Sequence, residues 1–502
     1  MATQPPSTKL SSQCEITLLG LGPGDPGLLT QEAVNWLQGL DTLYLRTKTH
    51  LAVRSLPGTL KLTSFDDHLM QSSDYEVAEA ALAAEIIRLA KEQGSITYAV
   101  PGNPLVAERT CQAIIQEARN DGISIRVIHG LSLLEPTVQL LALDTINNLV
   151  LLDALQLEKG KTPGFSPSST AIIFHLSSQA IAAGVKRTLL SVYPQNFEVQ
   201  LVHITGTNAN SVEKLPLAEM DESLNFGIGS SLFVPPLHSK ASFESFQEII
   251  ARLRAPDGCP WDREQTHLSL RPFLLEETYE TLDALDRADK MDLQEELGDL
   301  LLQILLHAQI ASENADFNIH DVILGIGTKL VRRHPHVFAD IDVADVSGVI
   351  RNWETIKAEE RLENGLSHKK GLLDGVPQAL PALSQSQAII ERVGRARFQA
   401  LIDKGEPGVI RQILTQMDAS DISDRKECIG DLLLAVSALA YRHGIDAESA
   451  LREELARFRA RFSQMERITL EEGVVLADLS DEEKMTIWQR VGQNMDHGMG
   501  MS

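Results

Sequence analysis

Two acidic motifs, sixteen residues apart, hold the densest group of potential metal ligands in the chain. The first, E-x-x-E, joins Glu277 to Glu280, and the second, E-x-x-D, joins Glu296 to Asp299. Residues three apart on a helix share one face, so each motif presents two carboxylates together. Two such helices side by side would gather four hard oxygen ligands, which suit Mg²⁺ (with Mn²⁺ as a substitute) and phosphate substrates. The spacing therefore predicts a divalent-metal site for a phosphorylated substrate.

A helix pair with a solvated acidic face is the competing interpretation. Apolar stripes run along both segments: Leu274, Leu275, Leu282 and Leu285 on the first, and Leu293, Leu297, Leu300, Leu301 and Ile304 on the second. Acidic residues that lie opposite such stripes usually face water. Crowding favours the metal site instead, because neighbouring carboxylates repel one another and none of the four has a lysine at i+4. A bound cation would relieve that repulsion.

Helices must position these carboxylates, since nearly all of the chain from Phe243 onward has helical periodicity. Five motifs follow one another in this region: CPWDREQTH (259–267), EETYE (276–280), EELGDLL (295–301), KLVRRHPHVF (329–338) and WETIK (353–357). In this order they resemble the MazG family of nucleoside triphosphate pyrophosphohydrolases. The resemblance implies an all-α fold, Mg²⁺ held by the two acidic motifs, and hydrolysis of a nucleoside triphosphate to the monophosphate and pyrophosphate.

Positive charge for the substrate phosphates is expected on the segment that carries Lys329, Arg332 and Arg333. These residues lie at i, i+3 and i+4 and so share a helical face, and arginine forks match phosphate oxygens. The alternative is an ion-pair network between helices, with Glu295 or Glu276 as the acidic partner. The same two carboxylates are the candidates for the base that accepts the proton of the attacking water.

Further candidate substrate contacts lie on both sides of the acidic motifs. The resemblance implies nucleotide contacts in the loop that contains Trp261, Asp262 and Gln265. An indole can stack on a base, although a tryptophan beside a proline is equally typical of a core residue. Trp353 and Lys357, one helical turn apart, are the candidates for covering the substrate.

The N-terminal half alternates strands and helices, which predicts an α/β domain. Strands are expected at 42–45, 96–100, 125–128, 171–175 and 200–204, and strand ends run into glycine turns at 20–25, 101–104, 129–132 and 205–207. Ligands of α/β proteins gather at the carboxyl ends of strands. Since neither a Rossmann fingerprint nor a Walker A motif is present, the pattern predicts a cofactor crevice without identifying the cofactor.

Six motifs of this half resemble the tetrapyrrole methylase family: GLGPGD, LYLRTKTH, SFDD, YAVPGNPLVAERT, GLSLLEPT and ITGT. They are closest to the methylase half of YabN-type proteins, in which that half is fused to MazG. The resemblance implies two α/β lobes that hold S-adenosyl-L-methionine between them, and a tetrapyrrole as the methyl acceptor.

Carried over by position, the resemblance assigns two groups of residues to the cofactor site. Gly22, Gly24 and Asp25 would face the substrate, whereas Pro101, Gly102, Asn103, Gly130 and Ser132 would lie near the methyl donor. Asn103 departs from the family pattern, because many methylases have an aspartate there and a carboxylate is lost. Two alternatives remain open: an S-adenosylmethionine-dependent methyltransferase whose helical half senses nucleotide without hydrolysing it, and a methylase half that only regulates or dimerises.

The expected organisation is multidomain. It comprises a disordered tail (1–13), a two-lobed α/β methylase-like domain (14–235), a linker (236–242), an all-α MazG-like domain (243–364), a second linker (365–381), a degenerate MazG-like copy (382–490) and a disordered tail (491–502). The second copy repeats the G-D-L-L-L of 298–302 at 430–434, but Cys428 stands in the place of Glu296. We therefore expect it to hold Mg²⁺ poorly and to pack against the first copy or against another subunit.

Composition limits the expected partners. The 502 residues include 69 acidic and 45 basic ones, and the net charge of −24 argues against binding duplex nucleic acid. No apolar run reaches the roughly 18 residues that span a bilayer. The four cysteines form no C-x-x-C pair, as expected for reduced thiols in the cytoplasm. We expect a cytoplasmic protein without membrane contact that binds nucleoside triphosphates and forms homo-oligomers through its helical domain.

Overall fold

A computed structural model describes residues 14–67, 75–146, 148–205, 209–237, 242–339, 341, 345–363, 371–419 and 422–498. The chain divides into two units, residues 1–264 and 265–502, and each is considered by itself. This division falls later than the linker predicted at 236–242, of which 238–241 lie outside the described residues. The predicted tail 1–13 and residues 365–370 of the second predicted linker also lie outside them.

The first lobe of the N-terminal unit is built on a parallel sheet. Its strands are β1 (Glu15–Gly20), β2 (Thr42–Leu45), β3 (Lys61–Ser64), β4 (Ser95–Val100) and β5 (Ser124–Ile128), in the order β3-β2-β4-β1-β5. The strands predicted at 42–45, 96–100 and 125–128 are therefore confirmed. Because β4, β1 and β5 are neighbours and parallel, the three glycine turns that follow them lie at the same edge of the sheet.

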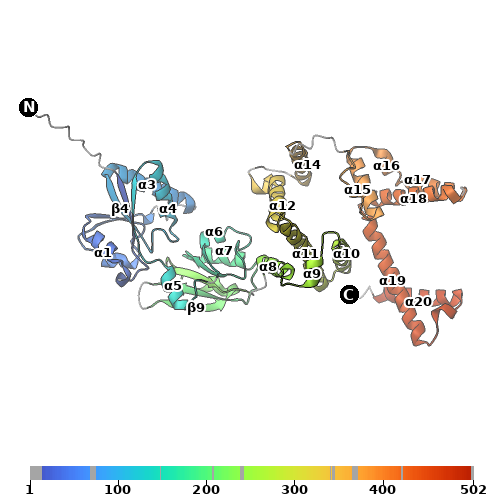
Figure 1. Ribbon diagram of the computed structural model, residues 1–502, viewed down its shortest axis with the longest axis horizontal. Coiled ribbons are helices and arrows are strands. Elements are labelled where there is room, and N and C mark those ends of the chain that lie inside the picture. Colours follow the sequence, from blue (N-terminus) through green and yellow to red (C-terminus); the bar gives the residue numbers. More distant parts are fainter. Residues whose placement is uncertain are drawn as a thin grey trace, which may run out of the picture. The chain divides into compact units, whose positions relative to one another are not determined.

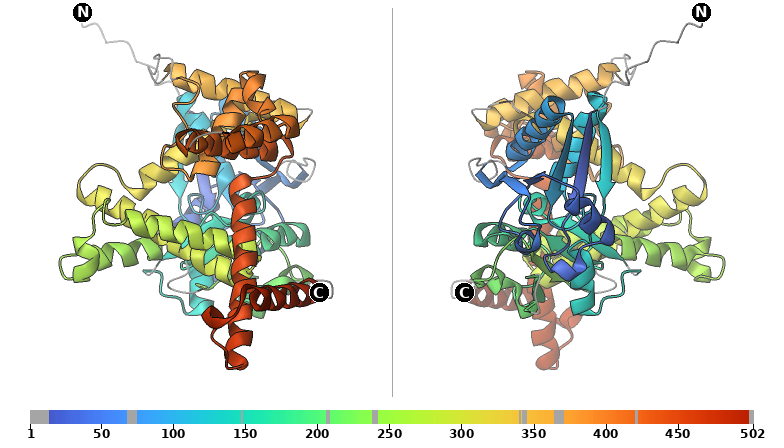
Figure 2. Two further views of the ribbon diagram at one scale, coloured as in Figure 1. Left: turned by 90° about the vertical axis from the view of Figure 1, so that its right-hand side faces the viewer. Right: turned by 90° about the vertical axis from the view of Figure 1, so that its left-hand side faces the viewer.

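Helices cover both faces of this sheet (Figures 1 and 2). On one face, α3 (Tyr75–Gln93) and α4 (Arg109–Asn120) bury Leu82, Ile86 and Ile114 against the strands. On the other, α1 (Gln31–Gln38) and the short helix η2 (Leu51–Ser55) do the same with Leu37 and Ala52. A parallel sheet that is buried on both faces explains the near-continuous apolar runs of these strands.

The second lobe is a mixed sheet in the order β6-β7-β10-β8-β9. Its elements are α5 (Leu134–Leu141), β6 (Leu149–Asp153), α6 (Ala154–Leu157), β7 (Thr170–Phe174), α7 (Gln179–Leu189), β8 (Glu198–His203), β9 (Ser211–Pro216), η3 (Leu217–Glu222) and β10 (Ser230–Val234). Only β6 and β7 pair in parallel, and the remaining pairs are antiparallel. The unit ends with α8 (Phe243–Arg254), which begins at a Ser242 capping box, and α9 (Pro260–Glu264).

The second unit contains helices and no strand among its described residues. Its first part comprises α10 (Arg271–Arg287), α11 (Lys290–Glu313), α12 (Ile319–Arg333), α13 (Pro335–Phe338) and α14 (Val346–Glu363). A two-residue turn joins α10 to α11, which pack along each other as a hairpin. Asp289 caps α11 by accepting hydrogen bonds from the backbone amides of Met291 and Asp292.

The remaining helices are α15 (Ala382–Arg395), α16 (Gln399–Asp403), α17 (Pro407–Ala419), α18 (Ile422–Arg442), α19 (Ala447–Glu471), η4 (Leu476–Asp478) and α20 (Asp481–Gly498). The tail predicted at 491–502 requires a correction, since α20 continues through Gly498, and only 499–502 lie outside the described residues. Within the described part of the chain no single helix meets the length and hydropathy of a membrane span, although α18 and α19, bent by 103°, meet them jointly.

Candidate functional site

The α10–α11 hairpin brings three of the four predicted metal ligands together. Carboxylate oxygens of Glu277, Glu280 and Glu296 lie within 4.8 Å of one another, and we call these residues the carboxylate cluster. Buried Thr281 lies at the same crossing, where its hydroxyl donates to the carbonyl of Glu277 at 2.7 Å and to that of Glu296 at 3.5 Å. The helix pair thus brings together three of the carboxylates that the two sequence motifs supply.

Like charges raise the proton affinity of this cluster. Partial burial and then the charges of Asp299, Glu280 and Glu296 raise the pKa of Glu277. Partial desolvation and then the charge of Glu280 raise the pKa of Glu296. Asp299 is not one of the three residues within 4.8 Å, but it acts electrostatically on both. Crowded carboxylates of this kind form a donor set that fits a divalent cation.

The predicted leucine stripes are only partly packed, since Leu274, Leu282, Leu293, Leu300 and Leu301 are half-buried while three other leucines are exposed. Leu275 is 56% exposed, Leu285 is 52% exposed and Leu297 is 51% exposed. The carboxylate cluster instead lies where α10 meets α11. Glu277 and Glu296 are half-buried there and Glu280 is exposed, so the cluster is open to solvent and within reach of a dissolved cation.

The predicted cations gather around an acid that the sequence did not single out. Arg333 donates to Glu360 of α14 at 2.5 Å, and Arg332 lies 4.0 Å from the same carboxylate. The hydrogen bond from Arg333, followed by the charges of Arg332 and Lys329, lowers the pKa of Glu360. An interhelical network therefore exists, and it contains Glu360, whereas the prediction named Glu295 or Glu276 as the acid. Glu360 lies beyond the last motif, so no local signal marked it.

Trp353 joins the same group of side chains. The Lys357 ammonium lies 4.4 Å from the centre of its ring, and the Arg333 guanidinium lies 5.6 Å from it. Both distances fit cation–π contacts. The structure thus brings Trp353, Lys357 and Arg333 together on α12 and α14, as part of one cationic patch with Glu360 at its centre.

The CPWDREQTH loop is divided between the two units. Trp261, which is 54% exposed, and Asp262 lie in the first unit, whereas Gln265 begins the second. The imidazole of His267 stacks on that of His307 in α11, with 2.8 Å between their Nδ1 atoms. Burial and the neighbouring His267 lower the pKa of His307. The end of this loop is thereby fixed to the helix that carries Glu296 and Asp299.

The residue that repeats Asp299 in the predicted second copy has a different partner. Asp431 of α18 accepts from the Lys404 ammonium at 3.0 Å. An aspartate paired with a lysine is already neutralised, so it has little need of a metal. Asp431 is therefore a suitable control for the role of Asp299.

The glycine turns of the first unit pack backbone against backbone. Gly22 and Gly102 exchange hydrogen bonds at 2.8 and 3.2 Å, and both have positive φ, at 68° and 70°. A Cβ on Gly130 would lie 2.4 Å from the carbonyl oxygen of Gly102. Only glycine permits such an approach. Asn103 holds the same turns, because its Nδ2 donates to the carbonyl of Gly130 at 2.8 Å.

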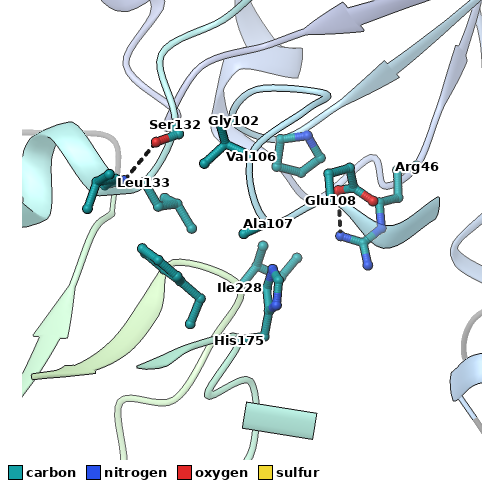
Figure 3. Close-up of a pocket in the computed structure, with 12 residues that line it drawn as sticks. Arg46, Gly102, Val106, Ala107, Glu108, Ser132, Leu133, His175 and Ile228 are labelled. Atoms are coloured by element: carbon teal, nitrogen blue, oxygen red, sulfur yellow. Dashed lines mark hydrogen bonds and ion pairs between the residues drawn. The ribbon is translucent and has the colours of Figure 1, made fainter. Parts of the chain in front are cut away.

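A small cleft lies between the two lobes beside these turns (Figure 3). Its lining, which defines the inter-lobe cleft, comprises Arg46, Pro101, Gly102, Val106, Ala107, Glu108, Ser132, Leu133, Leu134, Phe174, His175 and Ile228. Three predicted cofactor residues, Pro101, Gly102 and Ser132, are among them. Gly22, Asn103 and Gly130 support the turns behind the cleft. Asp25 accepts from the amide of Gly27 as a cap of the short helix η1 (Pro26–Leu28).

Charged residues in and beside the cleft escaped the sequence analysis. Buried Glu108 binds Arg46 at 3.1 Å, and although burial alone would lower the pKa of Arg46, Glu108 and the other acidic groups around it together outweigh burial and raise that pKa. Arg109 binds Glu79 at 3.3 Å. Arg46 lies inside the motif LYLRTKTH, and Glu108 and Arg109 lie inside the motif YAVPGNPLVAERT. The motifs therefore contained a signal, which glycine-centred reasoning overlooked.

Comparison with known proteins assigns the two halves to two domain types. Residues 15–221 match the tetrapyrrole (corrin/porphyrin) methylases, and residues 265–338 match the MazG nucleotide pyrophosphohydrolase domain. YabN of Bacillus subtilis (strain 168) is 36% identical over 483 residues, which cover 94% of this chain and 97% of that protein.

Two shorter relatives match the helical half. The nucleoside triphosphate pyrophosphohydrolase of Escherichia coli (strain K12) is 40% identical over 250 residues, which cover 48% of this chain and 94% of the relative. The nucleoside triphosphate pyrophosphohydrolase/pyrophosphatase MazG of Thermotoga maritima is 38% identical over 249 residues, covering 49% and 94% respectively.

Proposed function

The chain belongs to the family of YabN-like proteins, which join a tetrapyrrole methylase domain to a MazG domain, and on that premise we propose that it is a nucleoside triphosphate pyrophosphohydrolase. The products would be the nucleoside monophosphate and pyrophosphate. The observation that carries the proposal is the carboxylate cluster of α10 and α11. It is supported by relatives named for this activity, which align over nearly their whole length.

In this proposal Glu277, Glu280, Glu296 and Asp299 hold Mg²⁺, or Mn²⁺ in its place. The bound metal would neutralise charge on the substrate phosphates. Glu276 or Glu295 accepts the proton of the attacking water. Lys329 and Arg332 bind the pyrophosphate, while Arg333 is held by Glu360 and orients the patch.

In this proposal the nucleoside is bound by residues that precede the α10–α11 pair in the sequence and by residues that follow it. Trp353 and Lys357 form one ready contact surface, since the ring and the ammonium already lie together. Trp261, Asp262 and Gln265 are the proposed contacts from the preceding loop. For the other half we propose that the inter-lobe cleft binds S-adenosyl-L-methionine, with Pro101, Gly102 and Ser132 against it.

The test is pyrophosphate release from a panel of nucleoside triphosphates with Mg²⁺. Glu280→Gln and Asp299→Asn should each lower turnover by about a hundredfold or more, because losing even an outer-shell partner of a metal ligand typically costs about 10- to 100-fold. Asp431→Asn is the matched control and should retain full activity, because Asp431 is paired with Lys404. Normal turnover by Glu280→Gln would refute the assignment. Nucleotide binding without any pyrophosphate release by the wild type would favour the sensing alternative.

A further inference from the structure

A histidine–aspartate pair lies on the second-lobe side of the inter-lobe cleft. Asp153 ends β6 and His175 follows the end of β7, and these strands pair in parallel with Asp153 opposite Phe174. The register therefore brings the two side chains together, with His175 Nδ1 3.1 Å from Asp153 Oδ2. His175 lines the cleft, as Figure 3 shows, with its ring below Ala107.

The backbone at this point is held in an unusual conformation. His175 has φ of +65° and Ala107, across the cleft, has φ of +54°, so both occupy the left-handed region. Non-glycine residues seldom adopt it, so the backbone is strained at both positions. Strain of this kind concentrates at functional sites. Here it accompanies the turn that carries the imidazole into the cleft.

The partner of His175 determines which nitrogen carries the proton. A carboxylate that accepts at Nδ1 holds the proton there and leaves the lone pair of Nε2 unprotonated. Burial alone would raise the pKa of Asp153, but the contact with His175, the hydrogen bond from the backbone amide of Leu155 and the charge of Arg109 together outweigh burial and lower that pKa. Asp153 is therefore anionic at neutral pH, and it can accept the hydrogen bond that a proton on His175 Nδ1 donates.

The charges around the cleft limit what can enter it. Glu79, Glu108 and Asp153 are acidic, whereas Arg46 and Arg109 are the basic residues, and each arginine is bound to a glutamate. Glu135, which accepts a hydrogen bond from Ser132 of the lining, is a fourth acid, so with His175 neutral these groups sum to −2, from two positive and four negative charges. A polycarboxylate would have to break these ion pairs and would also be repelled. A neutral or cationic ligand would neither compete for these ion pairs nor be repelled by the negative charge.

We propose that His175 is the general base for a methyl transfer in this cleft, to a neutral or cationic acceptor that carries a removable N–H or O–H proton. His175 Nε2 takes that proton, and the freed lone pair forms a bond to the methyl carbon of a sulfonium donor. The carbon–sulfur bond breaks, and its electrons remain on the neutral thioether. Asp153 is the positioning residue that fixes the tautomer. This inference rests on the proposed binding of S-adenosylmethionine in the cleft.

The test uses the full chain labelled with ¹⁵N- and ¹³C-histidine, whose His175 signals are assigned by their loss in His175→Gln. Nuclear magnetic resonance should show the Nδ1–H tautomer in the wild type and a loss of that preference in Asp153→Asn. Saturating S-adenosylhomocysteine should shift the His175 signals and leave those of His203 unchanged. His203 is the matched control, because it lies in the same lobe and is bound to Ser230 outside the cleft lining.

Each contrary outcome has a distinct meaning. If S-adenosylhomocysteine does not bind in calorimetry, both the proposed cofactor and this inference fail. If it binds while His175 is in the Nε2–H tautomer or does not respond, only the inference fails. A porphyrin octacarboxylate should leave the His175 signals unchanged, and a shift on its addition would overturn the acceptor class. Asp153→Asn keeps the size of the side chain, so unchanged signals elsewhere verify that the fold survives.

Discussion

At the scale of single residues, repulsion within the carboxylate cluster lowers the stability of the metal-free protein, and a bound cation would relieve that repulsion. The pKa of Glu277 is raised in the folded chain, first by burial and then by its acidic neighbours. A carboxyl group with a raised pKa supports the fold below its unfolded pKa, and that support is lost as the pH rises through the folded value. At neutral pH the ionised Glu277 therefore opposes folding. A residue selected for stability alone would not be a glutamate here.

Replacing Glu277 by glutamine should consequently stabilise the metal-free protein. We expect the melting temperature at pH 7.5 to rise by about 1–2 °C, the size of a relieved like-charge contact. Added Mg²⁺ should raise the melting temperature of the wild type and have little effect on the variant, since binding to the folded state alone stabilises it. Differential scanning calorimetry measures both.

Glu313→Gln, at the other end of α11, is the control and should respond to Mg²⁺ like the wild type. A Glu277→Gln variant that melts lower than the wild type without metal, yet keeps the full Mg²⁺ response, would contradict the assignment of this residue.

At the scale of elements, the α10–α11 hairpin is fixed at both ends. Asp289 caps the turn that joins the helices, and the His267–His307 stack ties the opposite end to the preceding loop. The carboxylate cluster lies between these two points. The hairpin can therefore hold like charges close together, because packing away from the cluster opposes their separation.

The histidine stack should make this end of the hairpin sensitive to acid. The pKa of His307 is lowered by burial and then by His267, so its contribution to stability is present above the unfolded value near 6.5 and is lost as the pH falls below it. We expect the free energy of unfolding to fall as the pH is lowered below about 6.5. In the His307→Asn variant, the free energy of unfolding should fall less steeply over the same pH range. Urea titrations followed by circular dichroism at several pH values measure this slope.

His320→Asn, at the exposed start of α12, is the control and should keep the wild-type slope. Equal slopes for His307→Asn and the wild type would show that the stack does not respond to protonation.

At the scale of the whole molecule, the exposed leucines of the hairpin offer a surface for association. Leu275, Leu285 and Leu297 are each more than half exposed, although their spacing is that of a packed stripe. Apolar faces of this kind mark association surfaces in proteins. A second copy of the chain is the partner predicted for the helical domain, and a hairpin that packs its leucines against the same hairpin of another copy would bury both stripes.

Light scattering should accordingly show an oligomer for the wild type at micromolar concentration. Leu297→Glu places a charge in the stripe and should shift the mass toward that of one chain, while Leu224→Glu, at a 93% exposed site in the other unit, should leave it unchanged. A wild type that is monomeric at these concentrations would exclude this role for the leucines.

The sequence alone determined the local chemistry of this protein. Carboxylates three residues apart must share a helical face, and buried strands that end in glycine must form turns, so the carboxylate cluster and the strands of the first lobe could be predicted. Only the tertiary structure decided the partners: Arg333 with Glu360, 27 residues away, Arg46 with Glu108, 62 residues away, and His175 with Asp153, 22 residues away. It also decided that the acids lie where the two helices meet while leucines remain exposed. Periodicity tells which residues share a face, whereas the partner of that face depends on packing between segments that the sequence does not place side by side.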